Sequence, residues 1–240
     1  NSVDISGYDI DISSGNGWVT NRDLDEATNS GPTDSNTILI GNLSANSLYD
    51  LSINMINIYD LSNSKINRKL HTKPANFGVN DISQVDYPFG YTDKIKVTIT
   101  NPNVGSTIYD LSGYEYEYVL HGGNSDNGSG RHAAINGGKG ETNADLEITD
   151  LEYPNGRYDI CFNSVSLFNN NLKSAVKKVS MYTKPSNFSN NDISQNVSTT
   201  TKTAVGVYIN NSQHANTSEI SKYYIKISSS GHSPSYSITP

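Results

Sequence analysis

The sequence predicts an all-β protein made of tandem antiparallel β-sandwiches. Apolar and polar residues alternate over many short stretches, as expected for strands with one buried face. Turn-forming Asn and Gly are abundant between these stretches, and the apolar residues are chiefly Ile, Val, Leu and Tyr, which suit strands. The third observation is a pattern that returns after about 110 residues, the size of one sandwich domain.

The clearest repeat is a stretch that occurs twice with few changes. "TKPANFGVNDISQ" at 72–84 returns as "TKPSNFSNNDISQ" at 183–195. Proline fixes its own backbone angle and favours an extended residue before it, so both stretches read as the joint between one unit and the next. We expect Phe77 and Phe188 to pack into the following unit, at the end that faces the joint.

Other stretches repeat with similar offsets and give the order of elements within a unit. "ISGYDIDIS" at 5–13 resembles 111–119 and 220–228. The segment 37–53 resembles 145–162, and 93–103 resembles 202–212 more loosely. The complete unit therefore predicts, in order, a strand with Ile95, Val97 and Ile99, the "SGY" strand at 111–119, a variable loop at 121–143, a strand around Leu146 and Ile148, a strand from Tyr158, and a last strand over 175–182.

These motifs resemble the fibronectin type III family of immunoglobulin-like β-sandwiches. The "SGY" strand is similar to the third strand of that family, and Thr-x-Pro at the unit boundary is similar to its last strand. Leu43 with Tyr49, and Leu151 with Tyr158, resemble its tyrosine corner. Ile99 stands where the family usually has Trp. The resemblance implies a tandem of sandwiches in a rod.

The repeat divides the chain into three parts. Residues 1–73 are predicted to be the C-terminal part of one unit, 74–184 a complete unit, and 185–240 the N-terminal part of a third. A partial sandwich exposes an apolar face and an unpaired strand edge. Two explanations stay open: the residues belong to a longer array, or the partial units complete each other head to tail between molecules.

The variable loop is the first candidate for binding a partner, because sandwiches present function on loops. It is rich in glycine and contains His121, Arg131, His132 and Lys139. Flexible decoration is the alternative. "GGKGET" is similar to a phosphate-binding loop, but a glycine follows Lys139 where that motif needs Ser or Thr.

Two further patterns have a functional and a structural interpretation. Tyr114, Tyr116 and Tyr118 would form either a sugar-binding platform or a core face; the core face is favoured, because Ile replaces Tyr in the other units. Acidic residues alternate with these tyrosines and with the matching residues of the first unit. They would either bind Ca²⁺ or face solvent, and solvent is favoured; they are Asp9, Asp11, Glu115 and Glu117.

Several classes of function are disfavoured by composition. The net charge is −7 without a basic stripe, which argues against nucleic acid. No apolar run is long enough for a membrane helix, so no direct membrane insertion is expected. The histidines are dispersed, and we expect no enzyme, cofactor or metal site. Cys161, the only cysteine, lies in an alternating stretch and is expected to be a small buried residue.

The predicted function is that of a non-enzymatic structural protein, a spacer, fibre or coat component on an extracellular, cell-surface or virion surface. Its expected partners are proteins or further copies of itself. An adhesion or carbohydrate-binding module is the alternative, with glycans as partners. If the chain follows the secretory pathway, we expect it to be a glycoprotein. The N-glycosylation acceptor sequences are at Asn42, Asn127, Asn187, Asn196, Asn210 and Asn216.

Overall fold

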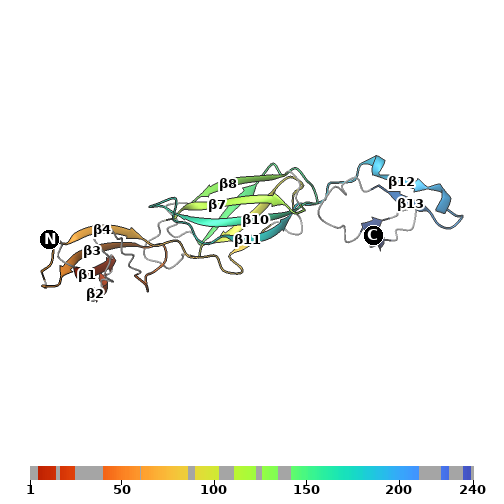
Figure 1. The fold of residues 1–240 in the computed structure, drawn as a ribbon. Coiled ribbons are helices and arrows are strands. Elements are labelled where there is room, and N and C mark those ends of the chain that lie inside the picture. Colours follow the sequence, from red (N-terminus) through yellow and green to blue (C-terminus); the bar gives the residue numbers. More distant parts are fainter. Residues whose placement is uncertain are drawn as a thin grey trace.

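A computed structural model shows a chain of antiparallel β-strands in three groups (Figure 1). The structure describes residues 5–14, 17–24, 40–59, 61–85, 90–102, 111–122, 126–134, 142–210, 223–226 and 235–238. In these ranges the only helical segments are two 3₁₀ turns, η2 (Asn190–Asp192) and η3 (Val197–Thr199). The predicted all-β, antiparallel class is confirmed. The domain boundaries remain predictions.

The first group, here called the N-terminal sheet, has the strand order β2-β1-β3-β4. Ile10 and Ile12 on β1 and Tyr49 on β3 form its buried cluster. These positions alternate with polar residues, as the sequence pattern requires. The strands are β1 (Ile5–Ser14), β2 (Gly17–Leu24), β3 (Leu48–Asn57) and β4 (Ile66–His71).

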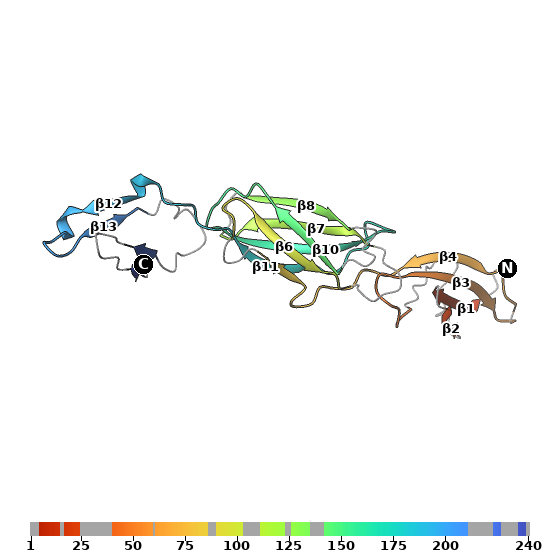
Figure 2. The same cartoon turned by 180° about the vertical axis from the view of Figure 1, so that it is seen from behind.

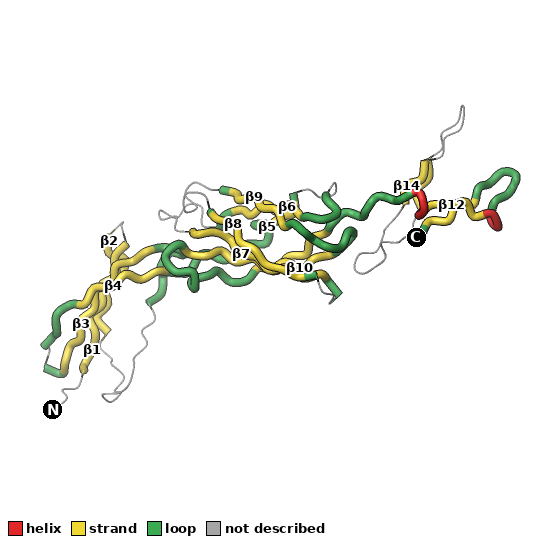
Figure 3. The backbone as a smooth tube through the Cα atoms, turned by 90° about the horizontal axis from the view of Figure 1, so that it is seen from above, coloured by secondary structure: helices red, strands yellow, loops and turns green. Residues whose placement is uncertain are grey.

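The second group, the central sandwich, has two sheets with the orders β11-β10-β7-β8 and β5-β6-β9. Figure 3 shows β9 and β6 in one layer and β7 and β10 in the other, and β6 is visible from behind in Figure 2. One buried cluster joins both sheets. The strands are β5 (Ile82–Gln84), β6 (Ile95–Thr100), β7 (Leu111–Leu120), β8 (Asn127–Ala133), β9 (Asn143–Ile148), β10 (Arg157–Ser166) and β11 (Lys177–Tyr182).

The third group consists of two short hairpins. Strand β12 (Ile193–Asn196) pairs with β13 (Gly206–Ile209), and β14 (Tyr223–Lys226) pairs with β15 (Ser235–Ile238). Phe188 lies near Tyr223, with ring centroids 6.0 Å apart and an interplanar angle of 39°. The pair Phe77 and Tyr114 of the central sandwich has almost the same geometry, 6.2 Å and 39°.

Three local expectations need correction or qualification. The segment 121–143 is not simply a loop, because β8 runs through it and pairs with β7. The last strand begins at Lys177 rather than at 175. Cys161 is only half-buried, because the alternation of β10 turns Ile160 and Phe162 into the core and therefore turns Cys161 outward.

Candidate functional site

The joint after the central sandwich is closed by hydrogen bonds from the repeated Thr-Lys-Pro stretch. The Thr183 hydroxyl accepts a bond from the Gly156 amide at 2.7 Å and donates one to the Tyr153 carbonyl at 2.7 Å. The Lys184 carbonyl accepts a bond from the Asn155 amide at 3.0 Å. Side chain and backbone together therefore tie the end of β11 to the turn before β10.

The joint after the N-terminal sheet repeats this arrangement bond for bond. The Thr72 hydroxyl accepts from the Ser47 amide at 2.9 Å and donates to the Ser44 carbonyl at 2.7 Å. The Lys73 carbonyl accepts from the Asn46 amide at 2.8 Å. We call this set of bonds the joint clasp. It explains why threonine recurs before the lysine and proline, because valine in its place would supply neither bond.

The clasp holds the two tyrosine corners that the sequence predicts. The Tyr158 hydroxyl accepts a bond from the Tyr153 amide at 3.2 Å, and the Tyr49 hydroxyl accepts one from the Ser44 amide at 2.8 Å. Turn residues with positive φ recur at matching places, which Asn and Asp tolerate best; they are Asn42 (61°) with Asp150 (60°), and Asn46 (48°) with Asn155 (55°).

One aromatic contact crosses the first joint. The His71 ring, at the end of β4, stacks on the Phe168 ring, in the loop between β10 and β11, with centroids 4.1 Å apart and an interplanar angle of 20°. The contact links the last strand of one group to a loop of the next. Sequence periodicity could not reveal it, because Phe168 lies outside the alternating strands.

Replacing Phe168 by alanine is expected to loosen this joint. Stacked rings contribute about 0.5–1.5 kcal/mol beyond their buried area, so amide hydrogen exchange at residues 71–73 should accelerate roughly two- to tenfold. Exchange measured by NMR tests this prediction. Tyr59→Ala is the matched control, since Tyr59 is exposed and follows Tyr49 by the same spacing as Phe168 follows Tyr158. Unchanged exchange in Phe168→Ala would contradict it.

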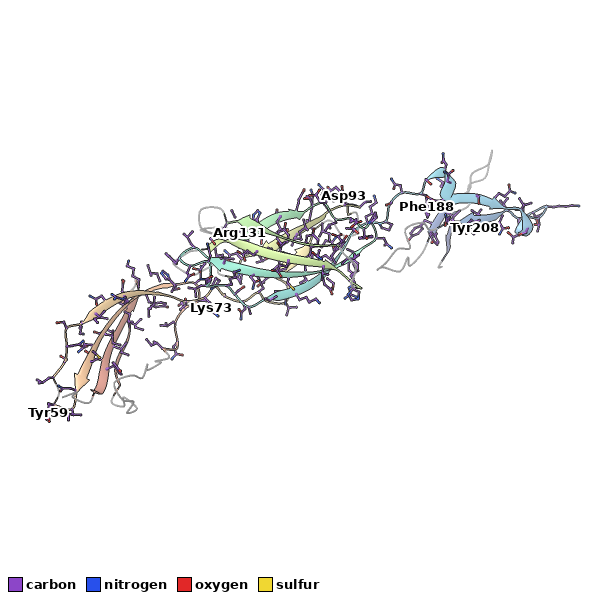
Figure 4. All side chains as sticks on the ribbon, turned by 45° about the horizontal axis from the view of Figure 1, so that its top comes forward. Tyr59, Lys73, Asp93, Arg131, Phe188 and Tyr208 are labelled. Atoms are coloured by element: carbon purple, nitrogen blue, oxygen red, sulfur yellow. The ribbon has the colours of Figure 1, made fainter. Side chains whose placement is uncertain are left out.

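The predicted binding residues do not converge. Arg131 and His132 lie on β8, where His132 is opposite Tyr114, while His121 follows the far end of β7. The six residue steps from Tyr114 to Leu120 span about 20 Å in a strand, so His121 and His132 lie far apart. Arg131 donates a hydrogen bond to the Ser112 hydroxyl at 2.6 Å (Figure 4 labels Arg131). Lys139 is outside the described residues.

The glycines of this segment have a packing role that the sequence did not reveal. Gly130 is opposite Tyr116 and Gly128 is opposite Tyr118 in the β7–β8 ladder. A side chain at either glycine would overlap the facing tyrosine ring. Tyr116 and Tyr118 are partly buried against the core, and Tyr114 is fully buried. The prediction that this stripe faces the core is therefore confirmed.

Three of the four acidic residues beside the tyrosine stripe and its counterpart are paired with lysines. Lys65 lies 2.6 Å from Asp11 and 3.5 Å from Asp9. Lys173 lies 2.6 Å from Glu115, and Glu117 is exposed. Within the described ranges, no three His, Cys, Asp or Glu side chains gather closely enough to hold a metal ion.

The carboxylate of Asp159, on β10, has a pKa well below its usual range. The Ser180 hydroxyl donates to it at 2.7 Å, Lys178 Nζ lies 3.1 Å away, and His121 Nδ1 lies 3.2 Å away. Burial alone would raise its pKa, but the hydrogen bonds from Ser180, Lys178 and His121 outweigh burial and lower the pKa to about 2. His121 thus contacts a carboxylate of its own chain.

The low pKa of Asp159 predicts a loss of stability in acid. The folded state keeps the carboxylate ionised down to about pH 2, whereas the unfolded chain binds the proton near pH 4. The stabilisation is thus complete above about pH 4 and is lost as the pH falls to about 2, at most about 2 kcal/mol. Asp159→Asn should flatten this part of the pH profile in urea unfolding. Asp50→Asn, at the matching exposed position on β3, is the control; an unflattened profile in Asp159→Asn would contradict the assignment.

The predicted glycosylation sites differ in exposure. Asn42, Asn127, Asn187 and Asn210 are exposed and Asn196 is half-buried. Asn216 lies outside the described residues. The side-chain oxygen of Asn196 accepts a hydrogen bond from Ser198, the hydroxyl residue of its own acceptor sequence, at 2.6 Å. The four exposed sites are therefore the more accessible ones.

The fold and these contacts define an all-β protein of antiparallel sheets with a repeated joint. No known family matches the sequence, and no curated protein matches it significantly. Among solved structures, the FN1–FN3 domains of chicken CNTN1 are similar at a TM-score of 0.31 and 13% identity, over 74% of this chain and 55% of that chain. No helix in the described ranges is long and apolar enough to cross a membrane.

Proposed function

We propose that this chain is a non-enzymatic structural protein, whose fibronectin type III-like sandwiches stack in a rod that acts as a spacer, fibre or coat component. The observation that carries the proposal is the joint clasp, which has the same donors and acceptors at both joints. An extracellular, cell-surface or virion location fits four exposed glycosylation sequences.

A spacer needs joints that resist bending. The clasp holds the two residues before each proline by three hydrogen bonds, two to the threonine hydroxyl and one to the lysine carbonyl, and the proline fixes its own φ. The His71–Phe168 stack adds a contact across the first joint. Identical clasps give similar geometry at successive joints, which is how a repeated unit builds a regular rod.

Small-angle X-ray scattering of the dilute chain tests the spacer function. Wild type should scatter as an extended particle with fixed joints. Inserting a Gly-Ser linker after Lys73 should broaden the distribution of distances, because such linkers are flexible coils. The same insertion after Gly41, an exposed position with open space around it, is the control. A wild-type profile already as broad as that of the joint insertion would overturn the proposal.

A carbohydrate-binding module is the second candidate. The observation that favours it is the exposed Arg131 on the edge strand β8, where it lies opposite Glu115 on the outer face of the sheet. Saturable binding to a glycan array, weakened by Arg131→Ala, would support this function. Removing 121–143 is not a suitable test, since the deletion removes strand β8 and exposes the edge of β7.

A further inference from the structure

Two side-chain amides of the repeated stretch bind the backbone of the last strand of the central sandwich and of the residues just before it. The Gln84 carboxamide makes a pair of hydrogen bonds with Tyr182: its Oε1 accepts from the Tyr182 amide at 3.0 Å, and its Nε2 donates to the Tyr182 carbonyl at 2.8 Å. The Asn76 Oδ1 accepts from the Ala175 amide at 2.8 Å. We call these three bonds the amide latch.

The latch lies on an edge of β11 that has no neighbouring strand in its sheet. Strand β11 ends the order β11-β10-β7-β8 (Figure 1). The amide and the carbonyl of Tyr182 bind Gln84, which lies on β5 in the other sheet. A carboxamide carries a donor and an acceptor side by side, as a residue of a neighbouring strand does. The latch therefore ties the first strand of the central sandwich to the last one, across both sheets.

The order of the contacts shows that the two latched segments run in the same direction. Asn76 precedes Gln84 along the chain, and their partners follow the same order, with Ala175 before Tyr182. The two latch residues are eight positions apart, and their partners are seven positions apart. The latch thus holds the segment 76–84 alongside the whole length of β11.

Tension along the chain acts on this latch in shear. The chain enters the central unit at Pro74 and leaves it at Lys184. A pull on the two joints therefore draws 76–84 toward its N-terminal end and 175–182 toward its C-terminal end. Because the segments run in the same direction, they are forced to slide past each other. All the latch bonds are then loaded together, whereas bonds loaded from one end break one after another.

We propose that the amide latch of Asn76 and Gln84 enables the central sandwich to stay folded under tension applied through its joints. The inference goes beyond the proposed spacer, whose joints resist bending, because it concerns resistance to pulling. Without the latch, β5 is held to β6 by a ladder of three residue pairs. Peeling β5 away also removes Phe77 and Ile82 from the core, so an open latch leads directly to loss of the core.

The repeat supplies a second argument. The Asn and the Gln are identical in both copies of the repeated stretch, and they are eight positions apart in each; the pairs are Asn76 with Gln84, and Asn187 with Gln195. The joint clasp uses the threonine and the lysine of the stretch, and so does not account for these two residues. Successive units of one chain carry the same tension, which gives each unit the same need for both amides.

Constant-force spectroscopy of the 240-residue chain, held at its two ends, tests this inference. Unfolding of the central sandwich is recognised by the release of about 110 residues, roughly 350–400 Å of extended chain. Gln84→Met keeps a side chain of similar length without its hydrogen bonds, and should raise the unfolding rate under load about tenfold. Asn76→Ala removes one bond and should raise that rate about fivefold.

Asn163→Ala is the matched control. The Asn163 side-chain amide donates to the Ser174 carbonyl at 3.0 Å, next to the Ala175 contact, but it joins β10 to the segment before β11. It therefore does not connect the first segment of the unit to the last. In urea without load, Asn163→Ala and Asn76→Ala should lose similar stability, whereas under load only the latch variants should unfold faster than wild type.

Two outcomes would overturn the inference. A wild-type unfolding rate under load in both Gln84→Met and Asn76→Ala would mean that the latch carries no tension. An equal acceleration in Asn163→Ala would mean that any loss of stability has the same effect. The scattering test of the spacer is separate: flexible joints with an intact latch would overturn the spacer alone, and fixed joints with an ineffective latch would overturn this inference alone.

Discussion

Replacing Gly113 by alanine is expected to lower the free energy of unfolding of the central sandwich by about 2–4 kcal/mol. Gly113 adopts φ +152°, a conformation that residues with a side chain rarely adopt. An added Cβ would also overlap the carbonyl oxygen of His132 on the neighbouring strand β8. That oxygen belongs to the backbone, so no side-chain rotation relieves the overlap, and β7 and β8 must separate.

Urea unfolding followed by circular dichroism measures this effect. Gly41→Ala is the matched control, because an added Cβ there meets no atom within 4 Å. We expect the control to change stability by less than about 0.5 kcal/mol. Equal stabilities of Gly113→Ala and wild type would show that the β7 backbone relaxes around residue 113, and would contradict the prediction.

Replacing Tyr158 by phenylalanine is expected to cost about 2–4 kcal/mol. The Tyr158 hydroxyl is buried, donates a hydrogen bond to Asp126 at 2.5 Å, and accepts one from the Tyr153 amide. Burial, and then the bond to Asp126, raise the pKa of this phenol, so it remains a donor at all ordinary pH values. Phenylalanine fills the same space but removes a donor from the buried Asp126 carboxylate, to which the Glu152 amide still donates at 2.9 Å.

The double variant Tyr158→Phe with Asp126→Ala separates the two contributions. Removing the carboxylate as well should recover part of the loss, since no buried charge then lacks its donor. Tyr182→Phe is the control, because the Tyr182 ring is exposed. Thermal unfolding of wild type, Tyr158→Phe, Asp126→Ala and the double variant gives the coupling directly. A Tyr158→Phe protein as stable as the control would contradict the assigned role of the corner.

Alternation and repetition within the sequence were enough to predict the strand class, the repeat and the joint. Alternation of Ile95, Val97 and Ile99 is a local property of the chain, and a period of two leaves only one arrangement in which all three are buried. The tyrosine corner and the Thr-Lys-Pro stretch were equally readable, because each consists of short-range hydrogen bonds between residues close in the unit.

Which segments become neighbours in space depends on tertiary packing and could not be predicted from the sequence. Composition predicts a flexible loop for the glycine-rich segment, but part of it forms β8. There Gly128 and Gly130 lie opposite Tyr118 and Tyr116, where a side chain would overlap the facing ring. The contacts of Asp159 with Lys178 and His121 and the stack of His71 on Phe168 likewise depend on packing between distant segments. A periodic pattern specifies which face of a strand is apolar, whereas the neighbour that covers that face is fixed only when the sheets pack together.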